Sequence, residues 1–234
     1  MQDIIQFLQN LQANNSREWF ADHKAEYQAA QARFNAFAES LQQQIVRFDP
    51  SVAGLTAKDM TYRIYRDTRF SKDKTPYKTH MGLFIARGGK KSGYAGYYMQ
   101  VGVENQSANF GDFHWETQHI IAPGHYCVEP KALQVIREDI VHGEGDFDRL
   151  VREVAHPDFR LVTSGSLKRN PKGFAADAPW SEYLRLKFFC LGMSADTDFL
   201  TAPRLAERVA ERFETARPFL DYINRAIDYV REEG

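Results

Sequence analysis

Apolar residues recur at three- and four-residue steps through the first fifty positions of this 234-residue chain. Residues 4–11 carry one short apolar face, and residues 20–48 carry a longer one that stops at Asp49 and Pro50. This spacing is the period of an α-helix, and Ser16 stands where a second helix needs a capping side chain. We therefore expect a short helix followed by a long one, so that residues 1–50 are helical.

Strand character follows over residues 59–122. Between positions 60 and 65, apolar or aromatic residues alternate with more polar ones, which is the period of a strand. In that strand Tyr62 and Ile64 would face the core, and Arg63 would face solvent or a cleft. Residues 81–105 have the pattern of a hairpin around a glycine-rich turn, and a further strand pair should follow before position 122.

Helices resume at Pro130, a residue suited to the first turn of a helix. Two helices are expected up to position 155, then a loop with one brief strand, then an apolar segment at 181–193 that fits a helix or a strand. A long amphipathic stripe begins at Pro203, with Pro218 as a kink or break. We find no repeat and no linker, so the prediction is one α+β domain over residues 1–234. Its central antiparallel or mixed sheet would be packed by the N-terminal helices and by a mainly helical segment 130–234.

Composition supports a folded protein, since 43% of the residues are hydrophobic and 13% are aromatic. Cys127 and Cys190 are too few for a disulfide framework and lack metal-site spacing, so we expect two buried thiols in a reducing cytoplasm. No apolar run is long enough to span a membrane, and the first residues lack the pattern of a signal peptide. We expect no membrane partner, and the sequence names no cofactor.

Charge is concentrated in one segment. Residues 58–80 hold seven Lys or Arg against three Asp, a local charge of +4 in a chain whose net charge is −1. Guanidinium groups bind phosphate or carboxylate in a bidentate manner, and lysines and hydroxyls can complete the shell of an anion. The alternative is a surface loop whose cations form salt bridges with its own carboxylates. Three acids, however, cannot neutralise seven bases. The candidate ligand-binding residues here are Arg63, Arg66, Asp67, Arg69, Lys72, Asp73, Lys74, Tyr77 and Lys78.

A second basic segment lies about a hundred residues further along the chain. It contains Lys168, Arg169 and Lys172, with no acidic residue between Asp158 and Asp177. Two loops of the same sign repel each other unless an anion lies between them or they lie on different faces. The first option predicts one cleft shared by both segments, and it adds these three cations to the candidate site.

Other constellations are weaker. His114 and Glu116 with His119 and His125 could suggest a metal site, but scattered histidines are more often not ligands, and we predict no metal. The serines at 164 and 166 lack the glycine pattern of a nucleophile elbow. Tyrosines at 94, 97 and 98 could stack nucleic-acid bases, although aromatic residues in strands are mostly packing residues.

Four segments together resemble the domain of unknown function 2461 family. They are NNSREWF at 14–20, YRIYRDTRFSKDKTPYKTHMG at 62–82, GYYMQV at 96–101 and LKRNPKGF at 167–174. The resemblance covers nearly the whole chain and implies that the cations of both basic segments belong to family motifs, but it implies no activity. The chain departs from the family pattern at PGHYCVEP, where members tend to have a double glycine, and it carries extra residues around DFHWETQ.

The leading hypothesis from the sequence is a protein with a cationic cleft that binds a phosphate-bearing small molecule or another small anion. If chemistry follows binding, phosphoryl transfer is the natural class, because positioned cations stabilise the charge that develops. Whether the protein is an enzyme stays open. The alternatives are a nucleic-acid or nucleotide binder and a docking module for an acidic protein.

Overall fold

The structure is a computed structural model that describes residues 1–103, 107–110, 113–115, 117–155 and 158–233. The first helices are α1 (Gln2–Ala13), α2 (Arg17–Asp22) and α3 (Lys24–Ile45). Ser16 caps α2 as predicted, its hydroxyl accepting a hydrogen bond of 3.1 Å from the Trp19 amide. The expected single long helix is instead divided at His23, whose ring stacks on Trp19 with 4.0 Å between ring centroids. The Nδ1 of His23 lies 2.8 Å from the Trp19 carbonyl oxygen, which also accepts the His23 amide at 3.0 Å.

Residues 50–80 are mostly irregular. A 3₁₀ turn (Pro50–Val52) and the short helix α4 (Ala57–Met60) are followed by only two isolated bridges, where Thr61 pairs with Leu83 and Tyr65 pairs with Tyr77. The prediction of a strand over 60–65 is therefore wrong. The chain leaves the sheet edge because it pairs with its own return, through the Arg66 amide to Pro76 and the Lys78 amide to Ile64. We call residues 62–80 the arm.

The sheet has five strands in the order β1, β2, β5, β7, β6, and every neighbouring pair is antiparallel. The strands are β1 (Met81–Ala86), β2 (Gly96–Val101), β5 (Ile120–His125), β6 (Arg160–Leu161) and β7 (Phe189–Ser194). A separate two-stranded sheet holds β3 (Ala108–Phe110) and β4 (Phe113–Trp115). The β1–β2 hairpin is as predicted, and Gly88 and Gly93 adopt the positive φ angles, 75° and 79°, that its turn requires.

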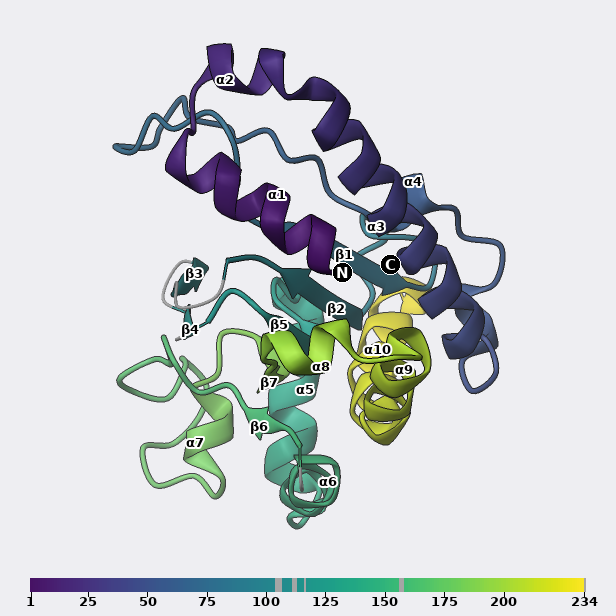
Figure 1. Cartoon of the computed structure of the whole chain (residues 1–234). Helices are drawn as coiled ribbons and strands as arrows, with labels where there is room; N and C mark the ends of the chain where they lie inside the picture. Colours follow the sequence, from purple (N-terminus) through teal and green to yellow (C-terminus); the bar gives the residue numbers. More distant parts are fainter. Residues whose placement is uncertain (104–106, 111–112, 116, 156–157, 234) are drawn as a thin grey trace.

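The second half of the chain supplies α5 (Pro130–His142), α6 (Asp146–Ala155), α7 (Ser181–Leu184), α8 (Thr197–Thr201), α9 (Leu205–Thr215) and α10 (Arg217–Glu233). The ambiguous segment 181–193 contains both types of element, since α7 precedes β7. The last stripe begins at Leu205 rather than Pro203, and it breaks at Ala216, just before Pro218. The α+β prediction is confirmed; in the view of Figure 1, α1–α3 lie above β1, and α5, α9 and α10 lie in the lower half of the molecule, at about the height of β7 and β6.

The two faces of the sheet have different environments, because successive strand residues point to opposite sides. Leu83, Ile85, Tyr97 and Met99 belong to one large buried cluster that also contains the apolar faces of α1, α3, α5, α9 and α10. The alternate positions of the same strands lie outside that cluster. Two small apolar groups lie on this side: Tyr98 with Ile120 and Ala122 of β5, and Cys190 of β7 with Val162 and Phe188, which flank β6 and β7. We call this second side the open face.

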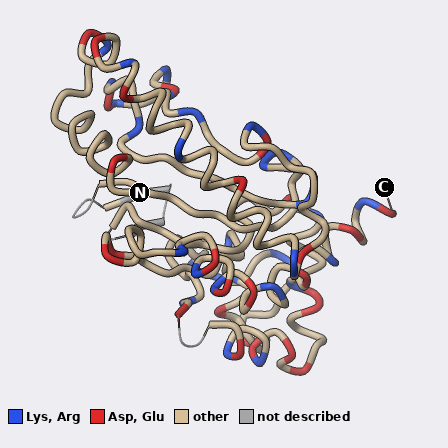
Figure 2. The backbone as a smooth tube through the Cα atoms, turned by 45° about the vertical axis from the view of Figure 1, so that its right-hand side comes forward, with Lys and Arg blue, Asp and Glu red and all other residues tan. Residues whose placement is uncertain are grey.

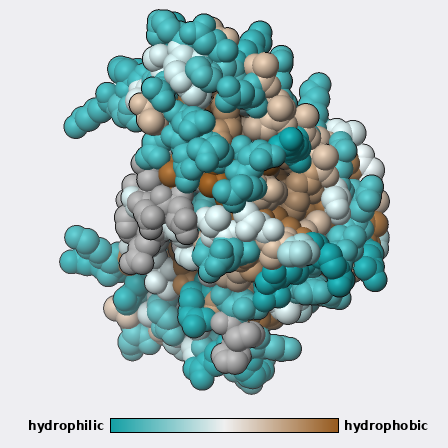
Figure 3. All heavy atoms as spheres, in the orientation of Figure 1, coloured by the Kyte–Doolittle hydropathy of each residue, from teal (hydrophilic) through white to brown (hydrophobic). Residues whose placement is uncertain are grey.

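The rest of the surface gives little sign of a specialised region. Basic and acidic residues both occur along most of the tube in Figure 2, in keeping with the net charge of −1. Hydrophilic residues dominate the face in Figure 3, with hydrophobic residues showing between the upper and lower helices. Within the described ranges, no helix is long and apolar enough to cross a membrane.

Candidate functional site

A pocket of about 660 Å³ lies on the open face of the sheet. Its floor is built from β1, β2, β5 and β7. The strand register places Phe84 of β1 beside Tyr98 of β2, and Tyr98 beside Ala122 of β5. Ile120 and Cys190 extend this floor. These five side chains carry no formal charge, because burial raises the pKa of the Cys190 thiol to about 12 and keeps it protonated.

Tyr98 lies across the start of β1. Its hydroxyl donates to the side-chain oxygen of Gln100 at 2.6 Å, and a Cβ on Gly82 would lie only 3.2 Å from that hydroxyl oxygen. The glycine at position 82 therefore leaves room for the tyrosine ring on the floor. A larger residue there would displace the ring toward the pocket.

The arm forms one wall of the pocket and supplies most of its charge. Arg63, Arg66 and Lys78 line the pocket together with Asp67, and Lys90 adds a fourth cation from the β1–β2 turn. Asp67 is the one acidic residue among the described residues of the lining. The pocket is thus apolar at its floor and cationic at its rim.

The cations of this wall differ in how they are neutralised. Arg66 forms an ion pair with Asp73, whereas neither Arg63 nor Lys78 pairs with a carboxylate within the part of the chain that is described. The Lys78 ammonium lies 5.9 Å from the centre of the Tyr62 ring, and the pKa of Lys78 is lowered by burial and by Arg63. Asp67 is close enough to feel the charge of Arg63, but one acid does not neutralise both cations, so the pair favours the entry of an anion.

His80 lines the pocket beside these cations. Burial, with the positive charges of Lys78 and Arg66 acting in the same direction, lowers its pKa to about 4. The imidazole is therefore neutral at pH 7. It can donate one hydrogen bond and accept another, but it adds no charge to the rim.

A second wall is formed where the β1–β2 turn meets the end of β5. His125 joins the two, since its Nε2 lies 2.8 Å from the Gly93 carbonyl oxygen and its Nδ1 accepts the Cys127 amide at 3.0 Å. These two contacts fix the neutral tautomer with the proton on Nε2, and burial lowers the pKa of this histidine. Tyr126 and Cys127 complete this side of the pocket.

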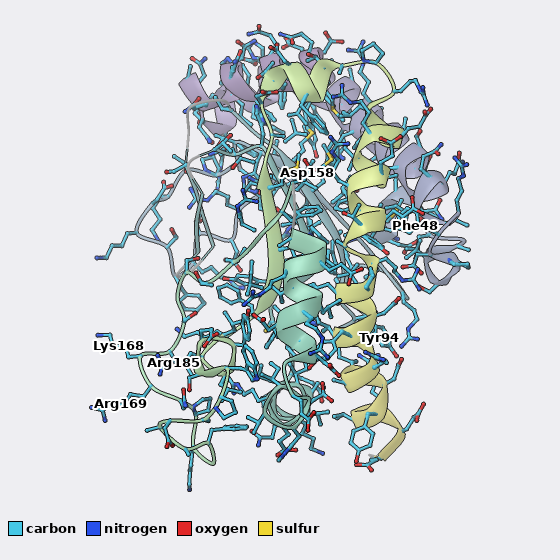
Figure 4. The ribbon with its side chains drawn as sticks, turned by 90° about the horizontal axis from the view of Figure 1, so that it is seen from below. Phe48, Tyr94, Asp158, Lys168, Arg169 and Arg185 are labelled. Carbon is cyan, nitrogen blue, oxygen red and sulfur yellow. The ribbon has the colours of Figure 1, made fainter. Side chains whose placement is uncertain are left out.

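The turn behind this wall is held by α10. The Tyr94 ring lies between two guanidinium groups, 3.7 Å from that of Arg87 and 4.1 Å from that of Arg231, and Figure 4 shows Tyr94 beside α10. Asp228 pairs with Arg87 and accepts the Tyr94 hydroxyl at 2.9 Å. This cation–π and ion-pair cluster therefore fixes the turn to α10.

The arm is held in a comparable way by the NNSREWF segment. The Asn15 side chain donates to the Tyr77 carbonyl oxygen at 3.0 Å and accepts the Tyr77 amide at 3.2 Å. Phe20 stacks on the Tyr77 ring with centroids 3.9 Å apart. Tyr77 is only 7% exposed and does not line the pocket, so its place is structural rather than beside a ligand.

Several of the candidate cations form ion pairs or hydrogen bonds within the outer part of the arm. Arg66 binds Asp73 and Thr75, and these contacts hold the pKa of Asp73 at about 2, with the Thr75 amide as the largest cause. Arg69 binds Asp67 through a guanidinium nitrogen at 2.6 Å, and Lys74 donates to the Thr68 carbonyl oxygen at 2.9 Å. The candidates Arg69, Lys72, Asp73 and Lys74 lie outside the pocket lining.

The second basic segment also lies outside the pocket. Lys168, Arg169 and Lys172 are exposed, and Figure 4 shows Lys168 and Arg169 pointing away from the body of the protein. The loop is organised by Asn170, which accepts the Arg185 Nε at 3.0 Å and donates to the Ser181 hydroxyl at 2.9 Å. The expectation that both basic segments line one cleft is therefore wrong. The two segments lie in different parts of the molecule, which limits the repulsion between their positive charges.

The weaker candidates are resolved in part. Among the described residues, no group of His, Cys, Asp and Glu could hold a metal ion, whereas Glu116 and the side chain of His114 lie outside what is described. The three tyrosines form no common platform. Tyr98 lies on the pocket floor, and Tyr94 lines the same pocket while it packs against α10. Tyr97 is buried in the core with its hydroxyl 3.0 Å from Asp49. Cys190 is buried as expected, but Cys127 is exposed.

Several pocket residues were missed from the sequence. The signal for them was present, because β1 and β5 are apolar on both faces, whereas an antiparallel sheet with one solvated face normally alternates apolar and polar residues. Apolar residues on the second face indicate that something covers or fills it. The missed lining residues are Tyr62, His80, Gly82, Phe84, Lys90, Gly93, Ile120, Ala122, Gly124, His125, Tyr126, Cys127 and Cys190.

Fold and site together define a class: an α+β protein whose five-stranded antiparallel sheet is covered by helices on one face and hollowed into a cation-rimmed pocket on the other. A family model described as conserved hypothetical protein (DUF2461) matches residues 3–222, and the chain belongs to this family. No curated protein and no solved structure gives a significant match.

Proposed function

We propose that the protein binds a phosphate-bearing small molecule in the pocket on the open face, with the phosphate at the arm. The observation that carries this proposal is the rim itself, which holds Arg63, Arg66, Lys78 and Lys90 with Asp67 as the acidic residue of the described lining. Arg66 is paired with Asp73 outside the lining, so the other cations carry the surplus charge. Guanidinium and ammonium groups are the side chains that bind phosphate most strongly. We assign binding and no reaction.

The geometry supports a small anion over a nucleic-acid strand. A strand needs a basic groove that follows several phosphates, and the cations here converge on one pocket while the second basic segment lies elsewhere. Dependence of affinity on salt separates the two cases. A small anion gives a shallow slope, whereas an oligonucleotide that neutralises several phosphates gives a steep one.

We also propose that the protein works in the cytoplasm. Support comes from Cys127 and Cys190, which are both free thiols although one of them is exposed. Free, exposed thiols persist in reducing compartments.

The test is titration calorimetry with methyl phosphate, on the wild type and on two double variants with equal changes of charge. Arg63→Gln with Lys78→Gln removes the unpaired cations of the rim, and each lost charged contact contributes about 1.5–3 kcal/mol. Affinity should fall at least a hundredfold. Lys168→Gln with Lys172→Gln removes two exposed cations outside the pocket and should leave the affinity within twofold of the wild type.

Equal losses in both double variants would mean that net charge, not the pocket, attracts the anion, and they would overturn the proposal. Absence of methyl phosphate binding by the wild type at millimolar concentration would overturn it as well. Thermal unfolding of each variant should accompany the titration, so that a loss of affinity is read only from folded protein.

A further inference from the structure

The pocket is much larger than its cationic rim requires. Its volume of about 660 Å³ falls within the range of about 300–1,000 Å³ that is usual for sites that bind whole organic ligands. A phosphate ion would occupy only the part beside the arm. The remaining space lies over the floor, so a ligand that fills the site has an organic body as well as an anionic group.

The chemistry of the floor indicates what that body is. Phe84, Ile120, Ala122 and Cys190 offer only carbon and a protonated thiol, and the hydroxyl proton of Tyr98 is already donated to Gln100. No charged side chain of the described lining comes from the strands. Sugars and other polar bodies would leave their hydroxyl groups without partners over such a floor, which costs free energy. The floor therefore favours an apolar body.

The walls add aromatic surface. Tyr62 is 37% exposed on the arm and Tyr126 is 50% exposed beside β5, and both line the pocket. Tyr126 is itself supported from behind by the Phe188 ring, with centroids 5.2 Å apart and planes 24° from parallel. Exposed aromatic residues gathered at a concave site mark a binding surface, and aromatic rings prefer to pack against other rings.

Charge and apolar surface are separated within the pocket. Arg63, Arg66 and Lys78 all come from the arm, beside the β1 edge of the sheet, whereas Cys190 belongs to β7 on the far side of β5. A ligand with an anionic end and an apolar end can satisfy both regions in one orientation. A ligand with charge at both ends cannot.

We propose that the natural ligand is an organic phosphate with an aromatic, apolar body, its phosphate at the arm and its ring system on the Phe84–Tyr98 floor. This inference rests on the proposed function and narrows its substrate class. The body is flat because the floor is a sheet surface, and the two tyrosines at the walls contact its edges or faces.

The test compares inorganic phosphate, methyl phosphate, phenyl phosphate, 1-naphthyl phosphate and the neutral compound 1-naphthol by titration calorimetry. Affinity should rise from methyl to phenyl to naphthyl phosphate, with at least a tenfold gain across the series, because each ring removes more apolar area from water. 1-Naphthol should bind at least tenfold more weakly than 1-naphthyl phosphate.

Two variants locate the effect. Phe84 is only partly buried, so Phe84→Ala should lower the affinity for 1-naphthyl phosphate at least fivefold and leave that for inorganic phosphate unchanged. Phe70→Ala removes an aromatic ring that is 96% exposed on the arm outside the pocket lining, and it should change neither affinity.

The outcomes separate the two proposals. Equal affinities for inorganic and naphthyl phosphate would overturn the aromatic body and leave the anion site standing. Equal affinities for 1-naphthol and 1-naphthyl phosphate would overturn the anion site itself, and failure of every phosphate to bind would overturn both.

Discussion

The attachment of the arm can be tested at Asn15, whose amide makes both of the hydrogen bonds to the Tyr77 backbone. Asn15→Asp preserves the shape of the side chain and the oxygen that accepts the Tyr77 amide. It replaces the donating NH₂ with a carboxylate oxygen, which then faces the Tyr77 carbonyl oxygen at about the former 3.0 Å separation. One hydrogen bond becomes a repulsion between two acceptors.

The expected cost follows from that exchange. A part-buried carbonyl left without its donor costs about 1–3 kcal/mol, and we take about 2 kcal/mol for this site. For a chain of this length each kcal/mol lowers the melting temperature by about 2–4 °C, so Asn15→Asp should lower it by about 4–8 °C at pH 7. Differential scanning calorimetry measures this shift, and hydrogen exchange should show faster exchange at the Lys78 and Arg66 amides of the arm.

The control is Gln28→Glu, which makes the same change from amide to carboxylate at an exposed side chain of α3 and should alter stability by less than about 0.5 kcal/mol. The pH dependence of the stability loss in Asn15→Asp gives a second check. The Tyr77 carbonyl raises the pKa of the introduced aspartic acid, because the neutral form can donate a hydrogen bond to it. Relative to wild type at the same pH, the loss should shrink below pH 4 and grow as the pH rises. Equal melting temperatures for the two variants at pH 7 would refute the attachment.

Three further variants test the core and the site. Tyr97→Phe removes the hydroxyl that donates to the buried Asp49 at 3.0 Å and should cost about 1–2 kcal/mol in urea unfolding, because Arg217 still pairs with that carboxylate; a cost near zero would contradict this reading. The depressed pKa of His80, about 4, means that the unfolded chain takes up a proton near pH 6.5 and the folded chain does not. The contribution of His80 to the free energy of unfolding is therefore fully present above pH 6.5 and falls by up to about 3 kcal/mol between pH 6.5 and 4. His80→Gln should flatten that part of the plot of stability against pH. Gly124→Ala should cost about 2–4 kcal/mol by calorimetry, since its φ is 145° and a Cβ would overlap the Phe189 carbonyl oxygen; a neutral result would show that β5 can shift.

Much of the fold could be predicted from local sequence patterns. Ser16 and its helix, the glycine-rich turn and the α+β class follow from nearest-neighbour chemistry and periodicity, and the structure agrees with them. The arm could not be found in this way. Residues 60–65 alternate like a strand, but only Thr61 and Tyr62 pair with β1, and the chain from Ile64 onward pairs with residues 76–78 instead. The position of residues 76–78 depends on the distant Asn15 and Phe20.

The candidate site shows the same division. The surplus of cations in residues 58–80 drew attention to Arg63, Arg66 and Lys78, and these three residues line the pocket. Charge counting could not tell which cations would be satisfied within the arm, because Asp67 and Asp73 lie equally close in sequence to several of them. It also gave no distance between the two basic segments, since the sign of a charge carries no information on which face of the sheet a loop reaches.

The two attachments of the pocket have a consequence for the order of folding. Asn15 and Phe20 fix the arm from near one end of the chain, while Asn224, Asp228 and Arg231 fix the β1–β2 turn from near the other. During synthesis these N-terminal and C-terminal residues leave the ribosome far apart in time. A nascent chain can therefore bury part of its core before α10 is present to hold the second wall of the pocket. Capacity for ligand should therefore appear abruptly, only when α10 has emerged and docked, and partial chains that already resist proteolysis should still bind nothing.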